Sequence, residues 1–498
     1  MNMETNLERH FETFREGIIG RNETFKNNNG EHRLLYADWT ASGRLYWPIE
    51  ETMAHRVGPW VANTHTETSL TGATMTRAYH KARQVIKKHV NASEDDVLIC
   101  CGTGMTGAMN RLLRILGLRV PEQLKPYLDI AEKKFPIVFI SHMEHHSNHT
   151  PWLETLAEVK LIPHTEDGLV DLEALERLLK SYRNRDKIVS VTACSNVTGI
   201  ELPYRKISRL AHENDALCFV DFACNAPYVD IDMNPNETEY IDAITFSPHK
   251  FLGGPGSSGV LIFKKKLYEL SAPENPGGGT VVFTDPWGNH RYKKDIEERE
   301  DGGTPGFLQT IRTAMAIRLK EKMGTQHIAR REEQINAMVF ERLEKVEGLT
   351  ILASQHRKRL SIFSFSLEGL NYDLVVKLLN DKFGIQARGG CSCAGTYGHY
   401  LMNIDEERSK QIMAGSELGC VINKPGWVRI SFHPTMTDSE IEKVCDAVER
   451  VAKKGMGWKK EYRFTPFGYR PKNQENDFLV SLEQWFDEKD QGKTLSNR

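Results

Sequence analysis

Between residues 95 and 265 the hydrophobic positions of the chain alternate between two periods. Short apolar runs rich in β-branched residues are followed by stretches in which apolar residues recur every three or four positions. The first pattern is typical of buried strands and the second of amphipathic helices, so the alternation predicts a mostly parallel sheet covered by helices. The predicted strands are 96–100, 136–141, 187–193, 216–222 and 243–247. Of the four predicted helices, one begins near Thr106 and one at Thr150-Pro151, and the other two span 171–183 and 204–215.

The C-terminal half predicts a second, smaller α/β domain. A glycine-rich interruption at 276–306 precedes a long helical pattern over about 308–346, and a further α/β alternation follows. The polar C-terminal tail is expected to be peripheral. We therefore expect an α/β protein with an N-terminal segment (1–45), a large domain (46–310), a small C-terminal domain (311–455) and a tail (456–498).

Composition limits the partners of the chain. In 498 residues, 65 Lys and Arg balance 67 Asp and Glu, so we expect no nucleic-acid or membrane-surface role that depends on bulk charge. No apolar run approaches the roughly 18 residues of a membrane span, and the N-terminus lacks the apolar core of a signal peptide. The nine cysteines are odd in number, and we expect them to be reduced thiols of a cytoplasmic protein.

A glycine loop follows the first predicted strand, where ligands of such sheets bind. The stretch "CGTGMTGAMN" (101–110) is a strand–loop–helix junction, whose free N–H groups and helix dipole favour an anion, most naturally phosphate. Gly102, Gly104 and Gly107 fit the dinucleotide fingerprint, but the acidic residue expected about twenty positions later is missing. A tight turn that serves only packing would fit the same residues.

The remaining predicted strands also end in residues able to do chemistry. A carboxylate that ends an apolar strand is costly unless it meets a cation or donor, and a partly desolvated lysine can form a Schiff base. Each residue alone could be an ordinary loop histidine, cap or solvated lysine. Together they supply what pyridoxal phosphate needs, whereas NAD would need neither the lysine nor the paired carboxylate. The residues are His145 and His146 after the second strand, Asn196 after the third, Asp221 at the end of the fourth and Lys250 after the fifth.

The stretch "RGGCSCAG" (388–395) places Cys391 and Cys393 in a glycine-rich loop. Half of a metal site, a redox pair, a nucleophile with a neighbour and two incidental small residues are all compatible with this pattern. No C-x-x-C pair occurs in the chain, so a zinc site is not expected.

These motifs, in this order, resemble those of class V (fold-type I) pyridoxal-phosphate enzymes, and within them the cysteine desulfurase/selenocysteine lyase group. The similarity runs from "LLYADWTASG" (34–43) to "WVRISFHPTMTDSEIE" (427–442). It implies the fold of these enzymes, a large domain built on a mostly parallel sheet and a smaller C-terminal α/β domain. It also implies pyridoxal 5'-phosphate as cofactor.

The resemblance implies a role for each matched residue. "SPHK" is similar to the Ser-x-His-Lys of the family, which makes Lys250 the Schiff-base lysine, and "MEHHSN" implies that His145 stacks on the cofactor ring. "WVRIS" places Arg429 where the family holds the substrate carboxylate, with Arg388 at the loop arginine. The implied cofactor-binding residues are Met105, Thr106, His145, Asn196, Asp221, Ser247, His249, Lys250 and Thr280.

The implied reaction removes sulfur from L-cysteine. "RGGCSCAG" resembles the desulfurase loop, with Cys393 as the nucleophile. Lys250 would remove the Cα proton and the Cys393 thiolate would attack the substrate sulfur, leaving a persulfide and alanine. "GGGT" (277–280) resembles a segment that such dimers lend to the partner's phosphate, so a homodimer is implied, and a sulfur-acceptor protein is a possible partner.

Some features depart from the desulfurase pattern and leave more than one function open. Cys224 replaces a glutamine of the family, "EDGGTP" (300–305) follows its motif loosely, and about thirty residues separate the cysteine loop from Arg429. The main competing hypothesis is a class V enzyme that acts on another amino acid, as an aminotransferase, epimerase or lyase, without a catalytic thiol. The same residues are also compatible with a sulfur-relay or interaction protein on a degenerate fold of this kind, and with a dinucleotide-dependent oxidoreductase.

Overall fold

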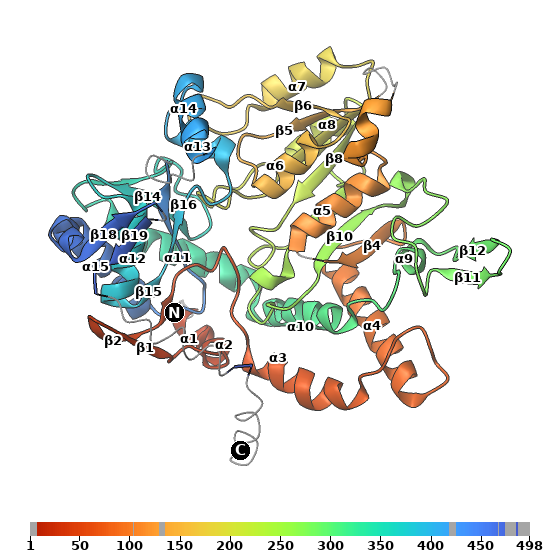
Figure 1. Ribbon diagram of the computed structural model, residues 1–498, viewed down its shortest axis with the longest axis horizontal. Coiled ribbons are helices and arrows are strands. Elements are labelled where there is room, and N and C mark those ends of the chain that lie inside the picture. The colour runs from red at the N-terminus through yellow and green to blue at the C-terminus, as the bar shows by residue number, and fades with distance from the viewer. Residues whose placement is uncertain are drawn as a thin grey trace, which may run out of the picture.

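The computed structural model describes residues 7–102, 104–128, 135–417, 425–466, 468–473 and 485–486. A seven-stranded sheet in the order β4-β10-β9-β8-β7-β5-β6 forms the centre of the larger half (Figure 1). Only β10 runs antiparallel to its neighbours β4 and β9, so the predicted, mostly parallel sheet is confirmed. The strands are β4 Asp96–Cys101, β5 Ile137–Ile140, β6 Glu158–Leu161, β7 Lys187–Thr192, β8 Ala216–Asp221, β9 Ala243–Phe246 and β10 Gly259–Lys264.

Helices cover both faces of this sheet (Figure 1). The helix expected to begin at Thr150-Pro151 begins four residues earlier, at His146. The reason is local: His145 is in an extended conformation and its Nδ1 accepts a hydrogen bond from the N–H of Ser147 at 3.1 Å, which caps the helix. The helices are α3 Trp47–Thr52, α4 Leu70–His89, α5 Gly104–Ile115, α6 His146–Leu153, α7 Leu172–Ser181, α8 Tyr204–His212 and the short α9 Ile296–Arg299.

The long helical pattern after residue 307 forms two helices instead of one. Helix α10 (Phe307–Met323) ends at Gly324, and α11 (Thr325–Leu343) begins directly after it. Gly324 has a φ of 79°, a left-handed conformation that breaks a helix and suits glycine. Ile317 of α10 belongs to the core of the large sheet, whereas Met323 belongs to the core of the C-terminal half. Helix α10 therefore connects the two cores.

A four-stranded antiparallel sheet in the order β13-β14-β17-β16 forms the smaller half. The N-terminal segment joins this half, because β3 pairs in parallel with β15. The loop after β16 leads into two further helices, α13 and α14, and residues 418–424 lie outside the described chain. The elements are α1 Leu7–His10, α2 Glu12–Glu16, β1 Thr24–Asn27, β2 Gly30–Arg33, β3 Leu35–Tyr36, β13 Leu349–Ile351, β14 Ile362–Leu367, α12 Tyr372–Phe383, β15 Ile385–Gln386, β16 Arg388–Gly390, α13 Gly395–Leu401, α14 Glu406–Glu417, β17 Trp427–Ser431 and α15 Asp438–Trp458.

Two hairpins extend from these cores. Strands β11 (Val281–Thr284) and β12 (His290–Tyr292) project from the large half at the right of Figure 1. Strands β18 (Tyr462–Thr465) and β19 (Gly468–Pro471) lie in the tail and pack on α12. No helix in the described part of the chain is long and apolar enough to cross a membrane.

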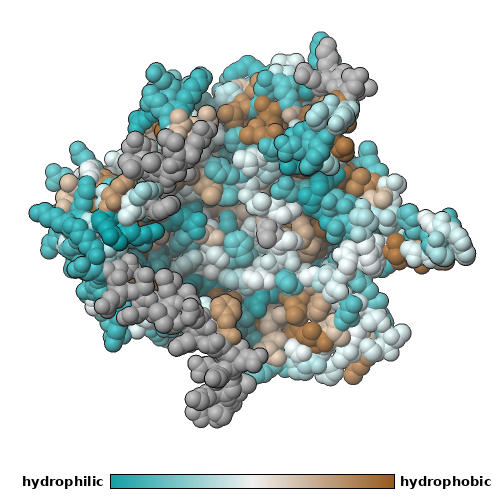
Figure 2. Space-filling view, viewed as in Figure 1, coloured by the Kyte–Doolittle hydropathy of each residue, from teal (hydrophilic) through white to brown (hydrophobic). Residues whose placement is uncertain are grey.

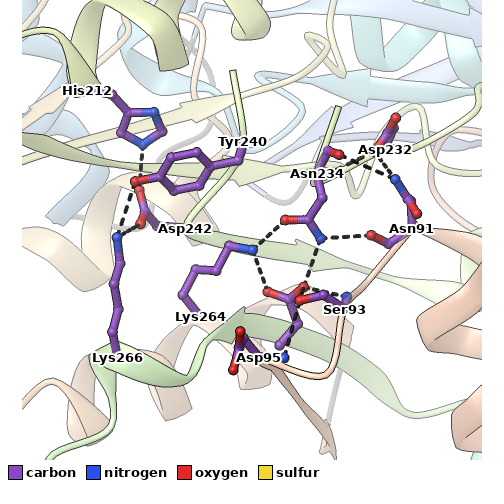
Figure 3. A network of polar contacts seen from close by, with 11 residues as sticks. Asn91, Ser93, Asp95, His212, Asp232, Asn234, Tyr240, Asp242, Lys264 and Lys266 are labelled. Carbon is purple, nitrogen blue, oxygen red and sulfur yellow. Dashed lines mark hydrogen bonds and ion pairs between the residues drawn. The ribbon is translucent and has the colours of Figure 1, made fainter. Parts of the chain in front are cut away.

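Buried ion pairs fix the ends of the sheet strands (Figure 3). The carboxylate of Asp96, at the start of β4, is fully buried and lies 2.9 Å from Lys264 Nζ at the end of β10. Asn234 Nδ2 and the Ser93 hydroxyl each donate a hydrogen bond of 2.8 Å to Asp96 Oδ2. Asp242 is equally buried and is paired with Lys266 and His212. Because each buried charge has partners, the network is compatible with a stable core.

Candidate active site

The loops that follow the strands of the large sheet converge on one cavity of about 190 Å³. The smaller half contributes residues of β16, β17 and the loop after β16 to the wall of this cavity. Eleven of the twelve residues expected from the sequence line it, and Thr280 does not. The eleven are Met105, Thr106, His145, Asn196, Asp221, Ser247, His249, Lys250, Arg388, Cys393 and Arg429.

Burial shifts the pKa values of both Lys250 and Asp221, which line the cavity. Burial lowers the pKa of Lys250, and the negative charges of Cys224 and Asp221 offset part of this effect. Burial raises the pKa of Asp221 to about 6, although the N–H of Ala223, which donates to Oδ1 at 2.8 Å, and the charge of Lys250 act in the opposite direction. A lysine with a lowered pKa has a larger fraction of free amine, which is the nucleophilic and proton-accepting form.

The imidazoles that line the cavity are held neutral. Burial lowers the pKa of His145 to about 3, and the neighbouring charge of Lys250 contributes in the same direction. Burial and Lys250 also lower the pKa of His249 to about 4. The Nδ1 of His145 accepts the Ser147 N–H, so the proton of the neutral ring lies on Nε2. A neutral, flat ring at this position is suited to stacking rather than to charge pairing.

One end of the cavity is rich in hydrogen-bond donors. Here α5 begins at Gly104, and the N–H of Met105 donates to Ser247 Oγ at 2.8 Å. The hydroxyls of Thr106 and Ser147 are 2.6 Å apart. Gly104 has a φ of 59°, and a Cβ there would lie 2.9 Å from Ser247 Oγ, so the close approach requires glycine. Three hydroxyls at the N-terminus of a twelve-residue helix form an environment suited to a phosphate.

Two arginines also line the cavity. The register of β16 and β17 places Arg388 directly across from Arg429. Arg429 is buried, and its Nη1 donates to the carbonyl of Asn196 at 3.0 Å. Both guanidinium groups donate to Asp38, a residue that sequence reasoning missed. Arg429 Nε is buried without a partner among the described residues, so the guanidinium retains a donor, as a carboxylate-binding arginine requires.

The cysteine loop has an unusual backbone. Ser392 and Cys393 are consecutive non-glycine residues with φ values of 51° and 57°, a conformation that costs on the order of 1 kcal/mol for each residue. Cys393 is exposed at the cavity wall, and Cys391 is partly buried against the core of the large half. All eight cysteines of the described chain are free thiols.

Two further thiols lie in the cavity wall. Cys194 and Cys224 follow β7 and β8, and their Sγ atoms lie 3.7 and 3.6 Å from the carbonyl oxygen of Ser195. A hydrogen bond from the Cys194 thiol lowers the pKa of Cys224, whereas burial raises the pKa of Cys194. Cys224 was expected as a departure from the family pattern, whereas Cys194 was not anticipated. Among the described residues, no group of three or more His, Cys, Asp or Glu is arranged to hold a metal ion.

The structure also adds residues that carried no separate signal in the sequence. They belong to segments already recognised, but their side chains are common loop residues, and only the fold shows which of them face the cavity. The added lining residues are Thr40, Ala41, Ser147, Thr192, Cys194 and Ser392, and Asp38 lies behind the arginine pair.

Comparison with known families gives a match over most of the chain. The sequence model described as aminotransferase class-V matches residues 35–444. The chain belongs to this family.

Among relatives of this class-V aminotransferase-family protein is a probable cysteine desulfurase of Halalkalibacterium halodurans, 29% identical over 365 residues, which are 72% of this chain and 84% of that protein. A probable cysteine desulfurase of Staphylococcus aureus is 27% identical over 371 residues, which are 74% and 84% of the two chains. The fold is shared with the cysteine desulfurase CsdA of Escherichia coli, with a TM-score of 0.68 at 23% identity over 89% of this chain and 98% of that chain. It is also shared with a cysteine desulfurase of Thermococcus onnurineus, with a TM-score of 0.67 at 24% identity over 84% and 95%.

Proposed function

We propose that this protein is a pyridoxal-phosphate-dependent cysteine desulfurase, which takes sulfur from L-cysteine and releases alanine. The observation that carries the proposal is the placement of one thiol. Cys393 lines the same cavity as Lys250, Asp221 and Arg429, so a nucleophile, a base and a carboxylate-binding group surround one small space. The names of the relatives favour the same activity.

The residues present suit pyridoxal phosphate. The donor-rich end suits its phosphate, and the neutral ring of His145 suits its aromatic face. Asp221 would face the pyridine nitrogen and Lys250 the aldehyde carbon. The amide oxygen of Asn196 is buried without a partner among the described residues, so this side chain keeps unused hydrogen-bonding capacity in the cavity wall. When bound, the cofactor supplies an electron sink for the Cα–H bond of the amino acid.

The protein's own residues would then perform the remaining steps. Arg429 and Arg388 bind the carboxylate of L-cysteine and orient its Cα–H bond toward Lys250. Lys250, as the free amine, removes the Cα proton and later returns a proton to the product. The Cys393 thiolate attacks the substrate sulfur, so a sulfur–sulfur bond forms while the carbon–sulfur bond breaks. The overall change converts L-cysteine and the Cys393 thiol into alanine and a Cys393 persulfide, with no external oxidant or reductant.

Product analysis tests this function. Purified protein loaded with pyridoxal phosphate is incubated with L-cysteine, and alanine and protein-bound persulfide are measured. Cys393→Ala should abolish both products, Lys250→Ala should abolish turnover, and Cys391→Ala should retain both products because Cys391 does not line the cavity. If the wild-type protein forms neither product, or if Cys393→Ala matches it on L-cysteine, a reaction on another amino acid without a thiol replaces this proposal.

We also propose that the enzyme is a homodimer. Thr280 lies outside the cavity of its own chain and caps a turn, with its hydroxyl donating to the Gly277 carbonyl at 2.7 Å. The nearby hairpin exposes Phe283 and Trp287, which are 55% and 85% exposed, and Figure 2 shows further apolar surface near α3 and α10. Exposed apolar surface of this kind is typical of an interface. Sedimentation of the protein should give a dimer. A mixed dimer of one Thr280→Ala chain and one Lys250→Ala chain should regain activity if Thr280 serves the partner's site.

The position of Cys393 also favours a sulfur-acceptor protein. Cys393 is exposed, so a persulfide on its thiol would be accessible to the thiol of another protein. Transfer of labelled sulfur from the Cys393 persulfide to a protein thiol, in competition with a small thiol, measures this step. Equal rates for protein and small-molecule thiols of matched pKa would contradict a dedicated acceptor.

A further inference from the structure

The loop that carries Cys393 is held by two residues of the large half. The main-chain N–H of His146 donates to the carbonyl of Cys393 at 2.8 Å. The Nε2 of the same histidine accepts a hydrogen bond from the N–H of Gly395 at 3.0 Å. Asn196 Nδ2 donates to the carbonyl of Ser392, the residue before Cys393, at 2.7 Å. His146 therefore contacts the loop on both sides of Ala394.

The backbone of the loop shows why such contacts matter. Ser392 and Cys393 both have left-handed φ values, and this conformation persists in non-glycine residues only where the surroundings hold it. The contact is also tight, because a Cβ on Gly395 would lie 3.2 Å from His146 Nε2. The loop is thus held in one strained conformation by contacts from α6 and from the segment after β7.

We propose that His146 is a positioning residue, whose ring holds the Cys393 loop in the conformation that presents the thiol to the cavity. This inference rests on the proposed function for its biological meaning, but the contact itself does not depend on turnover. As an acceptor, Nε2 carries no proton, so the ring acts as a neutral hydrogen-bond partner rather than as a charge. His146 is not among the residues that line the cavity, so its effect on the reaction passes through the loop.

The side chain can be separated from the backbone contact. Substitution of His146 leaves its main-chain N–H, which donates to Cys393, in place and removes the side-chain acceptor for Gly395. Loss of this acceptor should let residues 392–395 leave the strained conformation more often. The thiol of Cys393 should then react faster with a small alkylating reagent that needs no substrate binding, while the aligned attack on substrate sulfur becomes slower.

The experiment measures alkylation of Cys393 by iodoacetamide in the cofactor-loaded protein, by peptide mass spectrometry at fixed pH. We expect His146→Ala to raise the rate at least fivefold and His146→Gln, whose side-chain oxygen can accept from Gly395, to return it to within twofold of wild type. His149→Ala is the matched control, because His149 lies on the same helix and contacts Thr396, one residue beyond the held segment. It should remain within twofold.

A second variant perturbs the same contact from the loop side. Gly395→Ala places a Cβ against His146 Nε2 and should also accelerate alkylation, so the test does not depend on the folding of one variant. In turnover assays, His146→Ala should lower kcat on L-cysteine about tenfold or more with little change in KM, because the carboxylate-binding arginines are untouched. An alkylation rate within twofold of wild type for both His146→Ala and Gly395→Ala, or no recovery in His146→Gln, would overturn the inference. Because alkylation needs no turnover, a protein that fails to release sulfur from L-cysteine would contradict the proposed function without deciding this one.

Discussion

Asp38 forms a salt bridge with Arg429, in which Asp38 Oδ1 accepts a hydrogen bond from Arg429 Nη2 at 2.8 Å. Its second oxygen, Oδ2, accepts from Arg388 Nε at 3.1 Å. One carboxylate from the N-terminal segment therefore orients both guanidinium groups that face the cavity. It also balances part of their charge without removing their remaining donors.

Removal of this carboxylate should weaken substrate binding. In Asp38→Ala, the two arginines lose their shared partner and repel each other, so we expect KM for the amino acid to rise roughly tenfold or more. Steady-state kinetics of alanine formation measures the change. Asp95→Ala, at an exposed carboxylate that does not line the cavity, is the control and should leave KM unchanged. An unchanged KM in Asp38→Ala would contradict this role.

The two arginines should differ in importance. The side chain of Arg429 is 3% exposed and that of Arg388 is 47% exposed, so water screens contacts of Arg388 more strongly. Lysine keeps the charge but loses the planar fork of donors. We expect Arg429→Lys to lower kcat/KM by about a hundredfold and Arg388→Lys by about tenfold or less. The reverse order would show that Arg388 is the main carboxylate anchor.

Cys224 should raise the pKa of Lys250. The negative charge of Cys224 raises the pKa of Lys250 against the effect of burial. In Cys224→Ala the pKa of Lys250 should therefore fall further, and the free amine should be available at lower pH. The pH dependence of pyridoxal-phosphate capture by the cofactor-free protein should shift to lower pH in this variant. Cys445→Ala, at a buried thiol in α15, should leave the profile in place, and equal profiles for all three proteins would exclude the coupling.

His433 should make the protein sensitive to acid. Burial lowers the pKa of His433 to about 3, from an ordinary value of 6.5, so below pH 6.5 the unfolded chain binds a proton that the folded chain does not. The stability that this residue contributes is present above pH 6.5 and is lost as the pH falls toward 3, by up to about 1.4 kcal/mol per pH unit. Urea unfolding between pH 7.5 and 5 should show a steeper loss for wild type than for His433→Gln. Parallel curves for the two proteins would contradict the assignment.

The buried ion pair between Asp96 and Lys264 predicts that substitutions of Asp96 and of its sequence neighbour Asp95 differ strongly in their effect on the free energy of unfolding. Asp96 is fully buried and paired with Lys264, so Asp96→Ala leaves an unpaired buried charge and should cost about 3–5 kcal/mol of the free energy of unfolding. Asp95→Ala, one residue earlier and exposed, should change it by less than about 0.5 kcal/mol. Denaturant unfolding of both variants measures the difference.

The sequence predicted those parts of the fold that depend on local pattern. The five buried strands were expected because their apolar runs are continuous, and the site residues directly follow them. The edge strand β6 was missed because its residues are only partly buried, whereas β10 was missed although it is a buried, continuous apolar run. The helical pattern of the sequence continues through Gly324, so it did not indicate that the left-handed conformation of this residue separates α10 from α11.

The missed site residues depend on contacts between distant parts of the chain. Asp38 meets Arg429 across 391 residues of sequence, and no local pattern reports such a contact. Cys194 becomes notable only because the fold places it beside Cys224. Thr280 was expected from resemblance alone, and a role for it in the partner's site stays a prediction.

The two reactive groups of the proposed enzyme follow strands of different sheets, and the loop of Cys393 also packs against the core of the large half. Lys250 follows a strand of the large sheet, whereas the loop of Cys393 follows β16 of the small sheet, and α10 with its break at Gly324 links the two. The distance over which sulfur must travel is therefore set by how the small sheet and its Cys393 loop pack against the large half. A substitution in α11, remote from every reacting atom, could then change the rate of sulfur transfer while leaving cofactor capture intact.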